Sequence, residues 1–413
     1  MRSKNKYFYA AIIGNILEYY DVALYGLLLP KLAVLFFPHE DPTISMLWGL
    51  GVFASGFIMR PLGGALFGHI GDRLGRKKVL TLSIALTSIP ALIIGMLPTY
   101  AQIGMIAPVI LVMCRLAHGL CIGGESAGIL VYVLEKTQPN KANFVGSILC
   151  SVSFVGVLVG SAVSALCTRA SMPEWGWRIP FLITILLALY GYYFRKRLQE
   201  TELFKTAKAP IARIPLITVM KESKRNLLCT FGLGAACSIP FHVFTIYASS
   251  MMSLTLKIPL SQVIIFNMSI LGLLTIILPF MGLWADRINN VKLMHASMAA
   301  ISILAYPVFL LIGSQSLPLI IVGQIILVLV YSGFLASVSA FLVTLFPVRT
   351  RSTGIGVAYN LGNCVFGGTT PLIATQLVYL TGNSRSPAIY LFLAGLIGIA
   401  SVAFAKDTSL QEA

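Results

Sequence analysis

The amino-acid sequence predicts an all-α polytopic membrane protein, with twelve transmembrane helices arranged as two pseudo-symmetric six-helix bundles. Three observations predict this fold class. First, 57% of the 413 residues are hydrophobic and 11% are charged, whereas soluble globular domains are about 45–50% apolar and about 25% charged. Second, apolar runs of about 20 residues, long enough to cross a bilayer as a helix, recur along the whole chain. Third, a short charged motif is repeated in the two halves.

Each predicted helix is an apolar segment bounded by turn residues or by charges. In chain order, the twelve segments are 7–37, 45–70, 79–98, 104–134, 142–168, 177–194, 226–252, 260–285, 292–313, 316–346, 353–381 and 386–405. Because this number of segments is even, both chain termini are expected on the same side of the membrane.

The distribution of basic residues predicts which side carries the termini. The formal net charge is +16, from 30 Lys and Arg against 14 Asp and Glu, and such a balance is also found in proteins that bind nucleic acid. Here, however, 23 of the 30 basic residues fall in the termini and in every second loop, while four fall in the intervening loops. Loops rich in Lys and Arg stay in the cytoplasm. Both termini are therefore expected to be cytoplasmic, and no nucleic-acid partner is expected.

The chain is expected to divide at one polar, basic, Pro-containing segment, residues 195–225. This segment predicts a cytoplasmic linker between an N-terminal bundle (1–194) and a C-terminal bundle with a short cytoplasmic tail (226–413). The two halves share an Asp-Arg pair, which recurs after 214 residues. A duplicated six-helix unit is typical of membrane proteins whose two bundles rock about a site at the midplane.

The repeated motif predicts a conformational latch. Its first copy is Gly68-x3-Asp72-Arg73-x-Gly75-Arg76, in the expected loop after the second helix. Its glycines allow two helices to approach closely and the chain to reverse tightly, and the aspartate is suited to cap a helix or to accept from an Arg of a neighbouring helix. A plain basic turn is the alternative interpretation for the lysines that follow. Asp286 and Arg287 are expected to serve the latch of the second half.

Five segments, in order and nearly end to end, give the chain a family resemblance. They are GNILEYYDVALYG (14–26), RPLGGALFGHIGDRLGRKK (60–78), RLAHGLCIGGE (115–125), WGWRIPF (175–181) and STGIGVAYNLGNCVFGGTTPLIAT (352–375). The chain resembles the major facilitator superfamily, and more narrowly its metabolite:proton symporter family of proline/betaine, α-ketoglutarate, shikimate and citrate carriers. One departure is His118, at a position where such proteins more often carry Gln. The resemblance implies the fold of that superfamily and a bacterial cytoplasmic (inner) membrane.

Charged residues inside predicted spans are candidates for function, because each costs about 2.5–3.5 kcal/mol to insert at the helix centre. Glu18, Asp21 and Tyr25 share one face of the first predicted helix. A face of the fourth predicted helix likewise carries Arg115, His118 and Glu125. Acid and base on two inward faces would neutralise one another.

We expect Asp21 or Glu18 to be the protonation site, with Arg115 as its partner or as the anchor for a substrate carboxylate. Capture of that Arg by substrate would change the proton affinity of the acid, which is a route to coupling. The alternative is an ion pair that merely locks two helices together, an interpretation as good as the functional one for Glu18. His118 is a further candidate for proton coupling or a packing residue, and Glu125 is expected to be a structural acid.

Further substrate-binding candidates are Tyr25 and Arg60 in the first half, although Arg60 is equally well interpreted as an ion-paired structural residue. The second half contributes neutral candidates, His242, Tyr247, Tyr359, Asn360 and Asn363. One interior anchor suits a zwitterion or a monocarboxylate, whereas a dicarboxylate would need a second, for which Arg60 is the interior candidate. Aromatic residues around Tyr247 could face an ammonium group.

Several other classes of protein are disfavoured. No Gly-Lys dipeptide exists, so no Walker A loop of an ATP-driven pump can form. The seven cysteines show no CxxC pair or zinc-ligand spacing, and no enzyme activity, metal or organic cofactor is expected beyond the proton as coupling ion.

The resemblance implies a secondary-active, proton-coupled importer of a small organic solute, a zwitterionic osmolyte or a carboxylate metabolite, that works by alternating access as a monomer in contact with membrane lipid. The alternatives are a proton-driven exporter of hydrophobic compounds and a solute sensor that does not transport.

Overall fold

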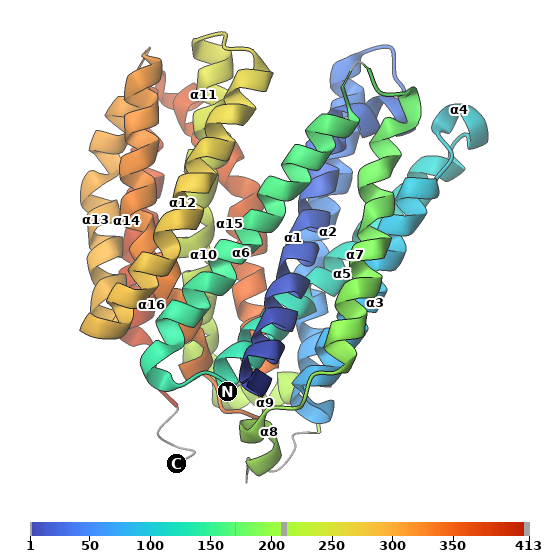
Figure 1. The fold of residues 1–413 in the computed structure, drawn as a ribbon. Coiled ribbons are helices and arrows are strands. Elements are labelled where there is room, and N and C mark those ends of the chain that lie inside the picture. The colour runs from blue at the N-terminus through green and yellow to red at the C-terminus, as the bar shows by residue number, and fades with distance from the viewer. Residues whose placement is uncertain (1, 170, 208–212, 315, 409–413) are drawn as a thin grey trace. The chain divides into compact units, whose positions relative to one another are not determined.

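The computed structural model describes residues 2–169, 171–207, 213–314 and 316–408, and these residues form helices and connecting turns without any strand (Figure 1). Packing divides the chain into two compact units. Unit 1 comprises Met1–Lys136, Val152–Leu216 and Val348–Val357, and unit 2 comprises Thr137–Ser151, Ile217–Pro347 and Ala358–Ala413. Two long helices, α6 (Ala142–Cys167) and α15 (Arg351–Thr381), contribute residues to both units. The expected division of the chain at a linker stays a prediction.

Unit 1 is built from helices of the first half of the chain together with the start of α15. In order they are α1 (Arg2–Phe36), α2 (Pro42–Leu74), α3 (Arg76–Met96), α4 (Tyr100–Ile103), α5 (Ile106–Glu135), the C-terminal part of α6 (Ala142–Cys167), η2 (Glu174–Trp177), α7 (Arg178–Lys196) and α8 (Glu202–Thr206). Helix α5 packs against α2 and α3, and α3 packs against α7. The core at one end holds Phe36, Trp177 and Phe181, all 3% exposed or less, with their rings edge to face. These contacts fix the position of α1, which carries the candidate acids.

Unit 2 repeats this helical architecture. It contains η1 (Pro139–Lys141), the start of α6, most of α9 (Pro215–Glu222), α10 (Lys224–His242), the π-helical turn η3 (Val243–Tyr247), α11 (Ala248–Thr255), α12 (Leu260–Ile288), α13 (Asn290–Ile312), α14 (Leu317–Thr344), most of α15 (Arg351–Thr381) and α16 (Ala388–Phe404). Helix α13 packs against α14 and α16, and α10 packs against α16. The turn η3 lies between His242 and Ala248, and π-helical turns are frequent at functional sites.

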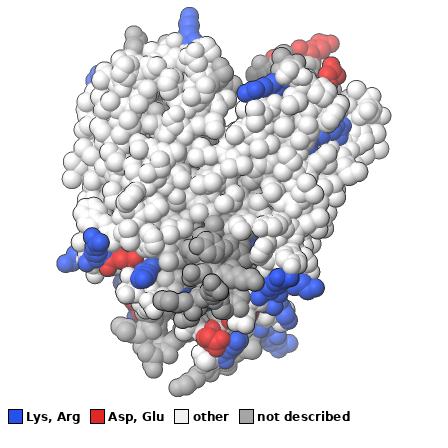
Figure 2. All heavy atoms as spheres, viewed as in Figure 1, with Lys and Arg blue, Asp and Glu red and all other residues white. Residues whose placement is uncertain are grey.

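The outer surface fits a bilayer. Ten helices in the described part of the chain are long and apolar enough to cross a membrane. The remaining two predicted spans, 353–381 and 386–405, coincide with the 31-residue α15 and the shorter, apolar, 17-residue α16. Large apolar side chains such as Trp48, Phe280 and Leu372 are more than half exposed. On the face shown in Figure 2, most of the coloured charged residues lie toward the helix ends, and most of the described surface between them is white, without Lys, Arg, Asp or Glu.

Three helix ends differ from the expectation. Helices α2 and α12 run on to Leu74 and Ile288, so both Asp-Arg pairs lie in a last helical turn and not in a loop. Helix α7 runs on to Lys196, which places Arg195 inside a helix and not in the linker. Asp72 and Asp286 cap other helices and Arg195 pairs with Glu125, so these buried or half-buried charges do not end the helix. The linker itself contains α8 and α9, while its residues 208–212 lie outside the described part.

Candidate functional site

Asp21, His118 and Arg115 form a buried row in unit 1. His118 Nε2 lies 2.9 Å from Asp21 Oδ2, and His118 Nδ1 lies 3.2 Å from Arg115 Nη1. All three side chains are 4% exposed or less. A direct pair of Asp21 with Arg115, one of the alternatives expected for Arg115, is not formed, because the imidazole of His118 lies between the two charges.

This geometry determines how His118 carries its proton. A guanidinium group has donors and no acceptor, so Nδ1 must accept from Arg115 and carries no hydrogen. The remaining hydrogen of a neutral imidazole is then on Nε2, the ring nitrogen that lies 2.9 Å from Asp21 Oδ2. A second proton can enter the ring only at Nδ1, which requires Arg115 to move away.

The guanidinium of Arg115 is held by aromatic rings. Its Cζ lies 4.4 Å from the centroid of Tyr25 and 5.7 Å from that of Phe53, and these two rings stack at 6.2 Å. Tyr25 is 1% exposed, and its hydroxyl donates to the Gly49 carbonyl at 3.3 Å. Cation–π contacts of this type stabilise a cation by about 0.5–2 kcal/mol. Among the described contacts, the guanidinium of Arg115 has no carboxylate partner. The guanidinium is therefore available to an anionic ligand.

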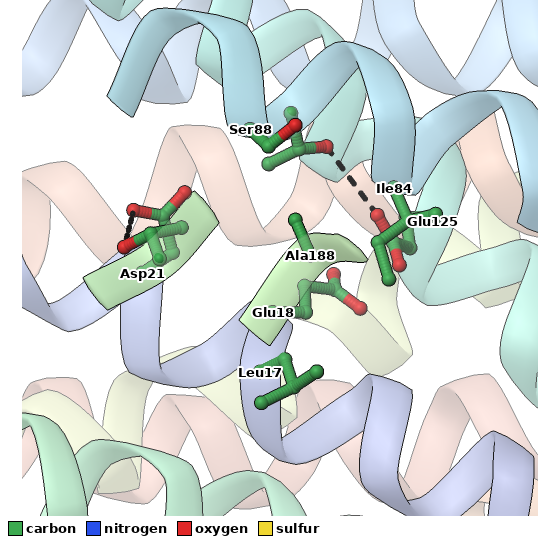
Figure 3. A pocket seen from close by; sticks show the side chains of 9 residues that line it. Leu17, Glu18, Asp21, Ile84, Ser88, Glu125 and Ala188 are labelled. Carbon is green, nitrogen blue, oxygen red and sulfur yellow. Dashed lines mark hydrogen bonds between the residues drawn. The ribbon is translucent and has the colours of Figure 1, made fainter. Parts of the chain in front are cut away.

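A second polar cluster lies around a small cavity of about 20 Å³ in the same unit, lined by Glu18, Asp21, Thr87, Ser88, Glu125 and Thr184 together with apolar residues (Figure 3). Glu18 and Glu125 are 4% and 1% exposed. Glu125 forms an ion pair with Arg195, which agrees with a structural role for this acid.

Arg195 is a residue that the sequence did not bring out. It is 0% exposed although it stands in a basic run, and its Nη1 also donates to the Leu80 carbonyl at 2.9 Å. The signal that could have identified it is its place in the last helical turn of α7, because a polar linker begins only after that turn.

Arg60 is half-buried, and its guanidinium lies 4.0 Å from the centroid of Phe57. This contact with a ring one turn earlier on the same helix fits the structural interpretation as well as the ligand-binding one.

The candidates in unit 2 surround α10 and α15. His242 Nδ1 lies 2.7 Å from the Ser238 carbonyl, and the Ser238 hydroxyl donates to Asn363 Oδ1 at 2.5 Å. Tyr247 is 1% exposed and donates to the Ser384 carbonyl at 3.3 Å. Tyr359 is half-buried and Asn360 is 5% exposed. His242 and Asn363 thus both contact Ser238, whereas the hydroxyl of Tyr247 is bonded to the Ser384 carbonyl.

The repeated motif forms a dense network in unit 1. Asp72, 0% exposed, accepts from the backbone amides of Ser352 and Thr353 at 3.0 and 2.8 Å, so it caps the start of α15. Its Oδ1 also accepts from Arg76 Nη1 at 3.1 Å. Both functions expected of this aspartate, helix cap and arginine partner, are therefore present. Gly68 leaves no room for a Cβ beside the backbone of Thr353.

Arg76 is the centre of this network. Its guanidinium donates to Glu135 Oε1 at 3.1 Å and to the Val348 carbonyl, and Glu135 also accepts from Arg351 Nη1 at 3.1 Å. Arg73, in contrast, is exposed and does not join the network.

Two acids of this network, Glu135 and Glu200, were not predicted. Glu200 accepts from the backbone amides of Arg76 and Lys77 at 3.1 and 3.2 Å, so it caps α3. Gly75 between α2 and α3 has φ +102°, which favours glycine, and no space remains for a Cβ beside Glu200 Oε2. The ammonium of Lys136 donates to the Gln199 carbonyl at 2.6 Å, and burial lowers the pKa of Lys136 while Glu200 opposes this.

Asp286 plays the corresponding part in unit 2. It accepts from the backbone amides of Asn143 and Phe144, both at 2.9 Å, and caps the start of α6. Arg287 is exposed. The two repeated aspartates thus cap the two helices that contribute to both units. Within the described residues, no group of three or more His, Cys, Asp or Glu is placed to hold a metal ion.

Comparison with known proteins identifies the family. Residues 7–213 match the family described as "Sugar (and other) transporter". The chain is 31% identical over 415 residues to the proline/betaine transporter of Escherichia coli (strain K12), a match that covers 97% of this chain and 83% of that one. The chain belongs to the major facilitator superfamily. It is also 31% identical over 413 residues to the ectoine/proline transporter ProP of Corynebacterium glutamicum, covering 94% and 81% of the two chains.

Solved structures of the major facilitator superfamily share this fold. The proton:xylose symporter XylE aligns with a TM-score of 0.72 at 16% identity, over 97% of this chain and 94% of that one. The human organic anion transporter MFSD10 aligns with a TM-score of 0.74 at 16% identity, over 97% and 99% of the two chains. The predicted twelve-helix fold and membership of the metabolite:proton symporter family are thereby confirmed. This member of the superfamily is a multi-pass membrane transporter of solutes and not an enzyme, because its relatives are transporters.

Proposed function

We propose that this transporter imports a small zwitterionic solute of the proline/betaine type together with protons. The observation that carries the proposal is the row Asp21–His118–Arg115, in which a cation free to bind a carboxylate lies against an imidazole that can take a proton. The names of the relatives, a proline/betaine transporter and an ectoine/proline transporter, support the same solute class.

The row offers a coupling mechanism. A solute carboxylate that binds Arg115 as a bidentate partner draws the guanidinium away from His118. His118 Nδ1 is then free to take a proton, and the resulting imidazolium is stabilised by Asp21 at 2.9 Å. Solute binding and proton binding thus favour one another, and such mutual coupling is what symport requires.

The rings beside Arg115 suit the cationic end of a zwitterion. When the guanidinium turns to the solute carboxylate, the faces of Tyr25 and Phe53 become available to an ammonium group. Quaternary ammonium ligands are bound by aromatic faces in this way. Polar groups of unit 2, including His242 and Asn363, are proposed to contribute neutral hydrogen bonds. Alternating access by rocking of the two bundles is proposed for the transport cycle.

The proposed location is a bacterial cytoplasmic membrane, with both termini on the cytoplasmic side. The excess of Lys and Arg in every second loop supports this orientation, and the bacterial relatives support the membrane. We further propose that the protein works as a monomer surrounded by lipid, with the proton as its coupling ion and without another cofactor.

Uptake of labelled proline into proteoliposomes tests the proposal. Accumulation should follow an inward proton gradient, collapse with a protonophore, and be inhibited by unlabelled betaine more strongly than by 2-oxoglutarate, citrate or shikimate. Inhibition by the carboxylates alone would overturn the zwitterion assignment. Solute binding without flux would indicate the sensor, and proton-driven efflux of hydrophobic compounds would indicate the exporter.

A further inference from the structure

Glu18 has an unusual environment for a carboxylate. It is 4% exposed, it lines the cavity of Figure 3, and neither of its oxygens has a hydrogen-bond partner among the described residues. An ionised carboxylate without donors in such a place is strongly disfavoured, and the group takes up a proton instead.

Donors that could satisfy Glu18 lie one helical turn away. Arg195 uses Nη1 for Glu125 and for Leu80, while its buried Nη2 and Nε have no hydrogen-bond partner among the described residues. Nη2 and Nε lie against α1 at Gly14, where they leave no room for a Cβ. Residues four apart on a helix are stacked on one face, about 6 Å apart along the axis, so Gly14 places the guanidinium next to Glu18.

We propose that Glu18 is a second proton-binding site, at which Glu18 and Glu125 compete for Arg195. When Glu18 carries a proton, it is neutral and Arg195 stays with Glu125, as in this structure. When Glu18 loses the proton, its carboxylate attracts Nη2 and Nε of Arg195. Glu18 thereby loses one proton and gains Arg195 as its ion-pair partner. Arg195 stands at the end of α7 that leads into the linker.

The other groups around the cavity are consistent with this exchange. Glu125 of α5 repels a negative Glu18, and Arg60 of α2 and Arg195 of α7 attract it. Asp21 of α1 is engaged with His118 and accepts from Thr184 of α7 at 3.4 Å. Thr87 of α3 donates to Glu125 at 3.4 Å. None of these described contacts gives Glu18 a donor, whereas Nη2 and Nε of Arg195 are unused donors beside α1.

Infrared difference spectroscopy between acidic and alkaline pH tests the proposal on the purified full chain in lipid nanodiscs. The wild-type protein should show the carbonyl stretch of a buried protonated carboxylic acid. Glu18→Gln should lack this band, and Asp21→Asn should retain it. Glu125→Gln should also lack it, although Glu18 is still present, because Arg195 then neutralises Glu18 and the proton leaves. Glu202→Gln is the matched control, since Glu202 has a 78% exposed side chain, and should leave the band unchanged.

Persistence of the band in Glu18→Gln, or its absence from the wild-type protein, would overturn the proton site. Persistence in Glu125→Gln would overturn the competition for Arg195.

Loss of the wild-type band when choline is replaced by sodium ions would show that the cavity binds a metal cation and not a proton. The measurement needs neither solute nor gradient, so its failure leaves the proposed symport intact. A failure of proline uptake would likewise leave the Glu18 site standing. If Glu125→Gln does not fold, the Glu18→Gln spectrum still decides the proton site.

Discussion

The cap formed by Asp72 offers a sharp test of how the start of α15 is held. The change Asp72→Asn keeps the size of the side chain and removes its charge. In the structure, two carboxylate oxygens serve three donors, the amides of Ser352 and Thr353 and the guanidinium of Arg76. Asparagine has one acceptor oxygen, so its NH₂ group must face a donor.

The expected cost follows from these contacts. One of the two backbone amides loses its acceptor, which costs about 1–2 kcal/mol. The NH₂ group of asparagine is a new buried donor without an acceptor, which costs about 1–3 kcal/mol, and Arg76 keeps Glu135, which limits the further loss. Together these give about 3 kcal/mol, or roughly a 100-fold increase in local opening at about 1.4 kcal/mol per factor of ten.

Hydrogen–deuterium exchange read by mass spectrometry measures this opening directly. In Asp72→Asn, the peptide that covers 348–357 should exchange about 100-fold faster than in the wild-type protein. The matched control is Asp286→Asn, because Asp286 caps α6 in unit 2 with two backbone amides but is only half-buried and contacts no arginine among the described ion pairs. It should accelerate exchange about tenfold at the start of α6 and leave 348–357 unchanged. In Asp72→Asn, the exchange rate of 348–357 should rise roughly 100-fold. A rate within about threefold of the wild-type rate would refute the reasoning.

Three further predictions follow from the site. Asp21→Asn should abolish gradient-driven proline accumulation while the protein remains in the membrane, because an amide cannot stabilise an imidazolium; full coupling in this variant, measured in proteoliposomes, would contradict the mechanism. Arg115→Lys should raise the KM for uptake about tenfold or more, since an ammonium lacks the planar fork that binds a carboxylate with two bonds; an unchanged KM would remove Arg115 from solute binding. Gly75→Ala should lower the free energy of unfolding by about 1–3 kcal/mol, because alanine is strained at positive φ and its Cβ meets Glu200. Thermal unfolding in detergent measures this, with Gly272→Ala as control, where nothing lies within 4 Å of an added Cβ.

The fold was accessible from the sequence to a large extent because membrane insertion is determined by properties that are local along the chain. A run of about 20 apolar residues marks a span whatever lies beside it, and the charges of the flanking loops predict its direction. The repeat of Asp72 at Asp286 revealed the duplication for the same reason. The helix ends were less accessible, because Asp72 and Arg195 are charged and yet lie within helices whose partners neutralise them.

Helical periodicity also placed the candidate residues on common faces, but it did not select their partners. Arg115 was expected to pair with Asp21 or Glu18 or to anchor a substrate carboxylate, and the sequence did not show that His118 lies between Asp21 and Arg115.

The sequence by itself thus determined the spans, the duplicated frame and the set of buried charges. The tertiary structure alone decided which charge meets which, since Glu125 and Arg195 are 70 residues apart and Asp72 and Thr353 are 281 apart. The physical reason is that an ion pair depends on the axial register and rotation of two packed helices. These are fixed by the sum of many side-chain contacts between helices, and hydropathy along a single helix carries no record of them.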